Sequence, residues 1–305
     1  MSISKEIAYF KSSTQEDNIY CKIWRDKDLK DYKGILQIIH GTFNHIDCFD
    51  ELGVFFAEKG YIVCGNDNLG SGKSGSLGCT CEKDGDIRIV DDMHLLTRIM
   101  KNRFGEALPY FILGDSTGSF IARNYCSYFS DEINGAVFSA CMNLPDIALL
   151  AENTIDKLAE KFGLFEPIVI LKKPFTNLLG FDKKGSLDFL TKDKKIIEQY
   201  KSDYLCSFNI SYSYLRDLIK LAINCSNDLW AKRIRKDLPI FLIGGAIDSL
   251  SSNGNSVISV CDRLCAENII PEVILYPDGK HDILHETNRD TVYKDLAKWL
   301  EENAV

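Results

Sequence analysis

The sequence predicts an α/β protein built on a mostly parallel, twisted sheet with helices on both faces. Short apolar runs typical of strands buried on both faces recur along the chain. Amphipathic helical segments alternate with these runs, which is the pattern of a parallel sheet. The length of 305 residues is long for one core and short for two full-sized domains. One domain with a large insertion is therefore expected.

The first half of the chain starts with a hairpin and then alternates strand and helix. The hairpin is expected at 6–11 and 19–24, joined by the polar turn SSTQEDN. The run GILQIIHGT contains five residues, 35–39, that are apolar except for Gln37, as in a doubly buried strand. Helical periodicity and stop signals such as Gly60 then predict helices at 47–59, 86–104 and 117–128, and strands at 61–67, 109–116 and 135–141.

The second half returns to the same rhythm after a long interruption. Strands are expected at 239–245 and 271–277, with helices at 256–267 and 287–302. The interruption is mostly helical in period. We therefore predict an α/β core made of residues 1–142 and 231–305, and a helical cap at 143–230 inserted after the sixth strand. Apolar clusters at 143–180 could line an acyl pocket, although most of them must pack the cap itself.

Composition narrows the possible functions. The chain has 36 basic and 44 acidic residues, a net charge of −8, and no basic stripe, which argues against nucleic-acid binding. No apolar run reaches the roughly 18 residues of a membrane span, and Glu6 interrupts any secretory signal. Eleven cysteines, mostly in apolar segments, indicate a reducing compartment, so a cytoplasmic location is expected. The spacings of Cys79-x-Cys81 and Cys261-x₃-Cys265 do not match a zinc site.

Three polar residues follow predicted strands at the sheet edge where ligands of parallel sheets bind. Ser116 ends a strand inside Gly-Asp-Ser-Thr-Gly, Asp248 lies three residues past the strand at 239–245, and His281 lies four residues past the strand at 271–277. Gly-x-Ser-x-Gly alone also fits an ordinary strand-to-helix turn. The order Ser, Asp, His is nevertheless that of α/β-hydrolase triads.

Each residue type suits nucleophilic catalysis. A serine hydroxyl needs a base, and an imidazole titrates near neutral pH, so Ser116 and His281 would form the reacting pair. Asp248 would hold the imidazole tautomer and stabilise its protonated form. The main-chain N–H groups of Thr117 and Thr42 would bind the oxyanion.

Competing interpretations remain for several residues. Asp237 precedes its strand and lies at the wrong edge, whereas Asp278 and Asp282 adjoin the histidine, where loop capping is usual. The segment His281-Asp-Ile-Leu-His285-Glu resembles a zinc-binding His-Glu-x-x-His motif with Asp for Glu, although a loop is expected there.

The other histidines have simpler expected roles. His40 is expected to shape the oxyanion loop and not to act as a base. His45 could equally rim the pocket or begin the next helix. His94 is expected at the surface of its helix.

Four segments together resemble the monoacylglycerol lipase and lysophospholipase-type α/β-hydrolases, a group also described as serine aminopeptidase-like. They are IIHGTFNHIDCFDELGVFFAEKGYIVCGNDNLGSGKSG, FILGDSTGSFIARNY, LIGGAIDSLSSNG and LYPDGKHDILHETNRD. The resemblance covers nearly the whole chain. It implies a capped α/β-hydrolase fold without a cofactor, the triad Ser116, Asp248 and His281, and oxyanion donors at Thr42 and Thr117.

The chain departs from the family pattern at a few positions. Its elbow reads Gly-Asp-Ser-Thr-Gly-Ser, where Asp115 replaces a common histidine and Ser119 replaces a glycine. Asn44 stands where glutamate is usual, and Asn68 and Ser71 alter the following glycine-rich stretch. A carboxylate at Asp115 would raise the pKa of His281 if the two groups are close and dry.

The function expected from the sequence is hydrolysis of a carboxylic ester with an apolar acyl group, through an acyl-enzyme on Ser116. The resemblance implies a monoacylglycerol or a lysophospholipid as the substrate class. A small soluble ester, an amide or a peptide is an alternative substrate. A ligand-binding homologue without turnover is an alternative of another class.

Overall fold

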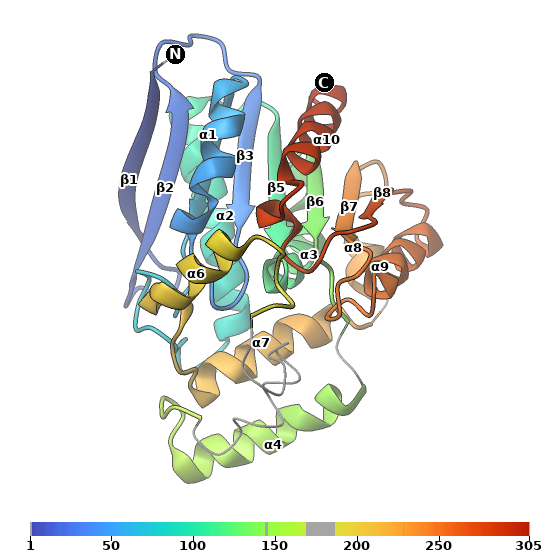
Figure 1. Ribbon diagram of the computed structural model, residues 1–305. Helices are drawn as coiled ribbons and strands as arrows, with labels where there is room; N and C mark the ends of the chain where they lie inside the picture. Colours follow the sequence, from blue (N-terminus) through green and yellow to red (C-terminus); the bar gives the residue numbers. More distant parts are fainter. Residues whose placement is uncertain (1, 144–145, 169–186, 228, 305) are drawn as a thin grey trace.

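The computed structural model describes residues 2–143, 146–168, 187–227 and 229–304 of the chain (Figure 1). Its described strands form one sheet in the order β1-β2-β4-β3-β5-β6-β7-β8. All pairs from β4 to β8 are parallel, and β2 adds antiparallel to β4. The strands are β1 Ile3–Lys11, β2 Asn18–Asp26, β3 Gly34–Ile39, β4 Tyr61–Asn66, β5 Tyr110–Asp115, β6 Gly135–Ser139, β7 Ile240–Gly245 and β8 Glu272–Tyr276. This sheet confirms the predicted fold class.

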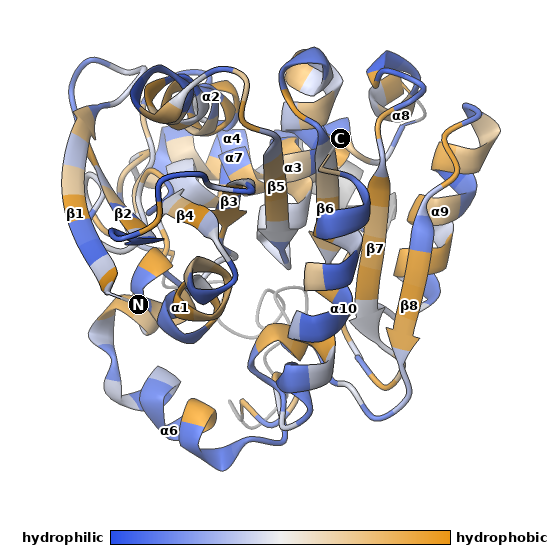
Figure 2. Ribbon diagram, turned by 90° about the horizontal axis from the view of Figure 1, so that it is seen from above, coloured by the Kyte–Doolittle hydropathy of each residue, from blue (hydrophilic) through white to orange (hydrophobic). Residues whose placement is uncertain are grey.

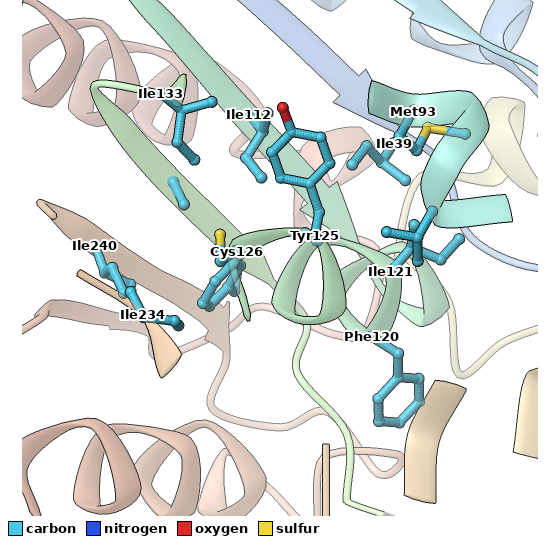
Figure 3. Close-up of a cluster of buried hydrophobic side chains, with 14 of the residues drawn as sticks. Ile39, Met93, Ile112, Phe120, Ile121, Tyr125, Cys126, Ile133, Ile234 and Ile240 are labelled. Atoms are coloured by element: carbon cyan, nitrogen blue, oxygen red, sulfur yellow. The ribbon is translucent and has the colours of Figure 1, made fainter. Parts of the chain in front are cut away.

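Helices cover both faces of the sheet (Figure 2). One face carries α1 Asp50–Glu58 and α10 Arg289–Glu302, and the other carries α2 Gly85–Phe104, α3 Thr117–Phe129 and α9 Asn255–Ala266. Adjacent residues of a buried strand supply opposite faces, because strand side chains alternate. In β5, Ile112 packs into the cluster of α2 and α3 shown in Figure 3, whereas Phe111 and Leu113 pack toward α1 and α10.

The expected elements form with small shifts at their ends. The hairpin strands extend beyond prediction, because β1 and β2 pair continuously from Ile3 opposite Asp26 to Lys11 opposite Asn18. The segment expected as one helix at 47–59 starts as the short 3₁₀ helix η1, Ile46–Phe49, and continues as α1. In the described part of the chain, 3₁₀ turns also form at η2 Ser130–Glu132, η3 Tyr204–Cys206 and η4 Ile283–His285.

Gln37, the polar residue within the apolar strand β3, is fully buried, and both ends of its side-chain amide form hydrogen bonds. Its amide nitrogen donates to the carbonyl oxygen of Met93 at 3.0 Å, and its amide oxygen accepts from the hydroxyls of Thr97 at 2.9 Å and Tyr110 at 2.5 Å. A buried amide is tolerated when its hydrogen bonds are made. This network ties β3 and β5 to α2.

Helices fill the described part of the chain between β6 and β7: α4 Asp146–Phe162, α6 Lys194–Ser202, α7 Tyr212–Asn224 and α8 Leu229–Arg233. The carboxyl ends of the parallel strands point toward α7, with α4 beyond it (Figure 1). A separate apolar cluster joins α4 to α7 through Ile155, Leu215 and Ile219. The predicted boundary at 230/231 falls inside α8, and residues 169–180 of the expected acyl-pocket segment lie outside the described residues.

Among the described residues, none of the helices combines the length and the apolar composition that crossing a bilayer would require.

The packing of α1 on β2 predicts that replacing Gly53 by alanine destabilises the protein. A Cβ atom on Gly53 would lie 2.6 Å from the Trp24 ring. Gly53→Ala should therefore lower the free energy of unfolding by about 1–3 kcal/mol, because the added methyl group overpacks the site. The same substitution inside a helix usually raises the free energy of unfolding by about 1 kcal/mol. Urea unfolding would measure this. In a Trp24→Leu background the same change should cost less, and an equal cost in both backgrounds would contradict the clash.

Candidate active site

Ser116 occupies a strained turn between β5 and α3. Its φ of 56° and ψ of −120° are rare for a residue with a side chain. Close packing around the turn requires its two glycines. A Cβ atom on Gly114 would lie 2.4 Å from the carbonyl oxygen of Gly118, and one on Gly118 would lie 2.2 Å from that of Ile39. The helix therefore approaches β3 and β5 closely, and Ser116 projects from the sheet edge.

The structure brings Ser116, His281 and Asp248 together from three loops at this edge. Oγ of Ser116 lies 2.7 Å from Nε2 of His281, and Nδ1 of His281 lies 2.9 Å from Oδ2 of Asp248. Because a carboxylate only accepts, Nδ1 carries the proton. In the neutral imidazole, Nε2 then accepts from the Ser116 hydroxyl. The carboxylate is fully buried, the imidazole nearly so, and the serine half-buried.

Asp248 is the carboxylate that reaches His281, and its rivals lie elsewhere. The second oxygen of Asp248 accepts from the N–H of Leu250 at 2.9 Å. Asp237 pairs with Arg235, and the side chain of Asp278 is 89% exposed. Asp282 contacts His285 instead.

Buried charges set the protonation of His281. Burial by itself would lower its pKa, but Asp248, followed by Asp115 and Asp282, raises it above the ordinary histidine value. Burial likewise opposes ionisation of Asp248, yet His281 and the N–H of Leu250 hold its pKa below the usual range. Asp115 is buried beside Asp282, and both effects raise its pKa to about 7, although the Ser139 hydroxyl donates to it at 2.6 Å. Asp115 therefore acts on His281 in the direction expected from the sequence.

The loop after β3 lies beside the serine. His40 is buried, and burial lowers its pKa to about 3, so its imidazole is neutral. Its Nε2 accepts from the N–H of Asn68 at 2.9 Å, consistent with a role in shaping the loop. The N–H of Thr42 donates to the hydroxyl oxygen of Thr117. Thr117 is the first residue of α3, where helix geometry leaves main-chain N–H groups without partners inside the helix.

The two histidines of the zinc-like segment face different partners. The nitrogens of His281 face Ser116 and Asp248. Those of His285 face Asp282, at 2.8 Å from Nδ1, and the carbonyl oxygen of Cys48, at 3.0 Å from Nε2. Neither imidazole has a nitrogen left for a shared ion, so the geometry does not support a metal site made by this segment.

The remaining histidines differ from each other. His45 is buried directly before η1, lies outside the cavity wall, and contacts Asp203 through Nε2 at 3.0 Å. His94 is partly buried, because its ring stacks on that of Phe129. Its Nε2 lies 2.8 Å from a carboxylate oxygen of Glu132. Its contacts are structural.

The segment between β6 and β7, called the insertion below, is hydrogen-bonded to the loop that carries His281. The main-chain N–H groups of His281 and Asp282 donate to the carbonyl oxygens of Phe189 and Leu190, the latter at 2.8 Å. The buried carboxylate of Glu286 accepts from the N–H of Lys192 at 2.9 Å. This part of the insertion is therefore held directly over the site.

Ser116 and His281 open into a cavity of about 260 Å³. Much of its wall is apolar and comes from the core helix α3, from α7 and from the segment before Thr191, namely Phe120, Leu215, Leu218, Ile219, Phe189 and Leu190. Sequence reasoning did not identify these wall residues, nor Tyr200, whose hydroxyl donates to Asp282 at 3.1 Å. A local signal, the amphipathic pattern of α7, exists for Leu215, Leu218 and Ile219.

Comparison with known proteins identifies the family of the chain. The family described as Serine aminopeptidase, S33 matches residues 30–288. A monoacylglycerol lipase of Mycolicibacterium smegmatis is 23% identical over 272 residues, covering 88% of this chain and 89% of that protein. A monoglyceride lipase homolog of Monkeypox virus is 21% identical and covers 93% and 94%.

Solved structures share the fold. A thermostable carboxyl esterase from Bacillus coagulans superposes with a TM-score of 0.90 at 22% identity, covering 99% of each chain. A monoglyceride lipase from Saccharomyces cerevisiae gives 0.73 at 22% identity, covering 98% of this chain and 96% of that one. With a family match over most of its length and this fold, the chain belongs to the serine aminopeptidase S33 family of α/β-hydrolases, and is a hydrolase of the lipase and esterase type.

Proposed function

We propose that this protein is a serine hydrolase that cleaves carboxylic esters with an apolar acyl group through an acyl-enzyme on Ser116. The observation that carries the proposal is the hydrogen-bonded chain from Asp248 through His281 to Ser116, which opens into a largely apolar cavity. Monoacylglycerol-like esters are the first candidates, because two relatives over most of the chain are described as a monoacylglycerol lipase and a monoglyceride lipase homolog. Lysophospholipid-like esters present the same acyl chemistry.

In the proposed reaction, the Ser116 oxygen attacks the ester carbonyl while Nε2 of His281 takes its proton. Asp248 stabilises the resulting imidazolium. The N–H groups of Thr117 and Thr42 bind the oxyanion, and each such donor is worth about 3 kcal/mol in the transition state. For Thr42 to act, the Thr117 hydroxyl that accepts its N–H must turn away. His281 then protonates the leaving alcohol, and water releases the acid by the same steps.

A cytoplasmic location belongs to the same proposal. All eleven cysteines lie among the described residues, and each is a free thiol. Free thiols persist in reducing compartments.

Two alternatives make different predictions. An esterase or amidase for small soluble substrates would keep the mechanism but not the acyl preference. A ligand-binding homologue would keep the cavity without turnover. A fluorophosphonate probe separates the last case, because a binder would leave Ser116 of the folded protein unlabelled.

The first prediction concerns a series of p-nitrophenyl esters and monoacylglycerols of increasing acyl length. The wild-type protein should prefer octanoyl over acetyl esters, since the cavity wall is apolar, and Ser116→Ala should lower kcat by roughly 10³-fold or more. Ser127→Ala is the matched control, because that hydroxyl lies on the same helix and its bonds to described residues go to the carbonyl oxygens of Arg123 and Trp230. Hydrolysis that survives Ser116→Ala would refute the mechanism, and preference for acetyl would refute the acyl assignment alone.

The second prediction concerns pH. His281 must be neutral to accept the serine proton, so kcat/KM should fall as pH drops through its pKa, which lies above the ordinary histidine value. Asp115→Asn removes one of the charges that raise this pKa. The fall of kcat/KM on the acid side of the pH profile, its acid limb, should therefore move to lower pH. The amide can still accept from Ser139. Asp278→Asn, at an exposed position, should leave the limb in place. A limb that does not move in Asp115→Asn would contradict the assigned coupling.

A further inference from the structure

Two cysteines and a histidine meet where the insertion touches the core. His45 directly precedes η1, and Cys48 lies within it. Cys206 is the last residue of η3 in the insertion. One ring nitrogen of His45 and the two sulfur atoms all lie within 4.8 Å of one another. The sulfur atoms are 3.9 Å apart. The proposed hydrolytic mechanism uses none of these groups.

We propose that His45, Cys48 and Cys206 bind a zinc ion that links the insertion to the core. Thiolate sulfur and imidazole nitrogen are the donors that Zn²⁺ prefers. With Zn–S distances of about 2.3 Å, two sulfurs of a tetrahedral site lie about 3.8 Å apart. The observed separation of 3.9 Å fits this value without rearrangement. Binding forms two Zn–S bonds and one Zn–N bond, and the thiol protons pass to solvent.

The histidine is arranged like a metal ligand. Its side chain is buried, and its Nδ1 has no hydrogen-bond partner among the described residues, which is costly for a polar atom. Its Nε2 lies 3.0 Å from Oδ2 of Asp203. A metal-bound imidazole commonly donates its other N–H to a carboxylate, which fixes the tautomer and ring orientation. Asp203 therefore leaves Nδ1 as the nitrogen available to the ion.

The site would support the wall of the cavity. Cys206 also lines the cavity that contains Ser116 and His281, and the carbonyl oxygen of Cys48 accepts from His285. An ion held by both cysteines would therefore fix η3 against η1 at the edge of the candidate active site. Both cysteines are half-buried, so a water molecule can occupy the fourth position.

A second cysteine pair provides an internal comparison. Cys261 and Cys265 of α9 also have their sulfur atoms 3.9 Å apart. No histidine or carboxylate completes a three-ligand group with them among the described residues. They should not hold zinc with comparable affinity.

The test uses the full chain, stripped of metal with a chelator and kept in a non-thiol reductant so that no disulfide forms. Calorimetric titration with Zn²⁺ should give one equivalent per chain. Titration with Co²⁺ should give thiolate-to-cobalt charge-transfer absorption. Cys48→Ser and Cys206→Ser should each weaken zinc binding by roughly 100-fold or more and halve that absorption, because one of two thiolates is lost. Cys261→Ser/Cys265→Ser should bind as the wild type does.

Two further variants keep the test decisive. His45→Gln should weaken zinc binding while retaining the thiolate absorption, and circular dichroism checks that each variant is folded. Cys206→Ser, in the short η3 turn, is the variant least expected to disturb the core. Absence of stoichiometric binding by the wild type would overturn the proposal. So would equal loss of binding in the α9 double variant, or unchanged binding in both single cysteine variants.

Discussion

The close approach of α3 to β3 and β5 is the constraint on which the site depends. Only glycine fits at positions 114 and 118, because a Cβ atom at either would meet backbone oxygen at 2.4 Å or less. This approach lets the chain reverse within one residue, at the cost of a strained φ at Ser116. The same turn places the first N–H groups of α3 beside the hydroxyl. The proposed nucleophile and the helix dipole that would stabilise its oxyanion intermediate therefore come from one packing arrangement.

Charge in the site is distributed over two histidine–aspartate pairs and one additional acid. Asp248 pairs with His281, and Asp282 pairs with His285, whose pKa is raised to about 9 by Asp282 despite the opposing effect of burial. Asp115 lies near both pairs, and its burial together with the charge of Asp282 raises its pKa. Buried charges are tolerated when they are paired and hydrogen-bonded. The second pair therefore helps to hold the loop that carries His281.

The insertion takes part in the site as well as covering it. Its segment at 187–190 accepts hydrogen bonds from the main chain beside His281, its Tyr200 donates to Asp282, and its α7 forms much of the apolar wall. The proposed zinc ion would add a link through Cys206. The hydrogen bonds among these contacts join residues 82 or 92 positions apart in the chain. The shape of the cavity therefore depends on how the insertion is seated.

The sequence alone determined the parallel sheet, the order of its elements and the edge at which polar residues gather. Periodicity reports strands and helices locally, and the carboxyl ends of parallel strands meet at one edge, so Ser116, Asp248 and His281 could be grouped without coordinates. Only the tertiary structure decided that His45 turns away from the cavity toward Cys48 and Cys206, and which insertion side chains form the wall. The spacing rules for zinc motifs examine neighbouring cysteines and could not group Cys48 with Cys206, which lies 158 residues further along the chain. Such contacts arise from long-range packing between loops, and packing of this kind leaves no periodic signal in the chain.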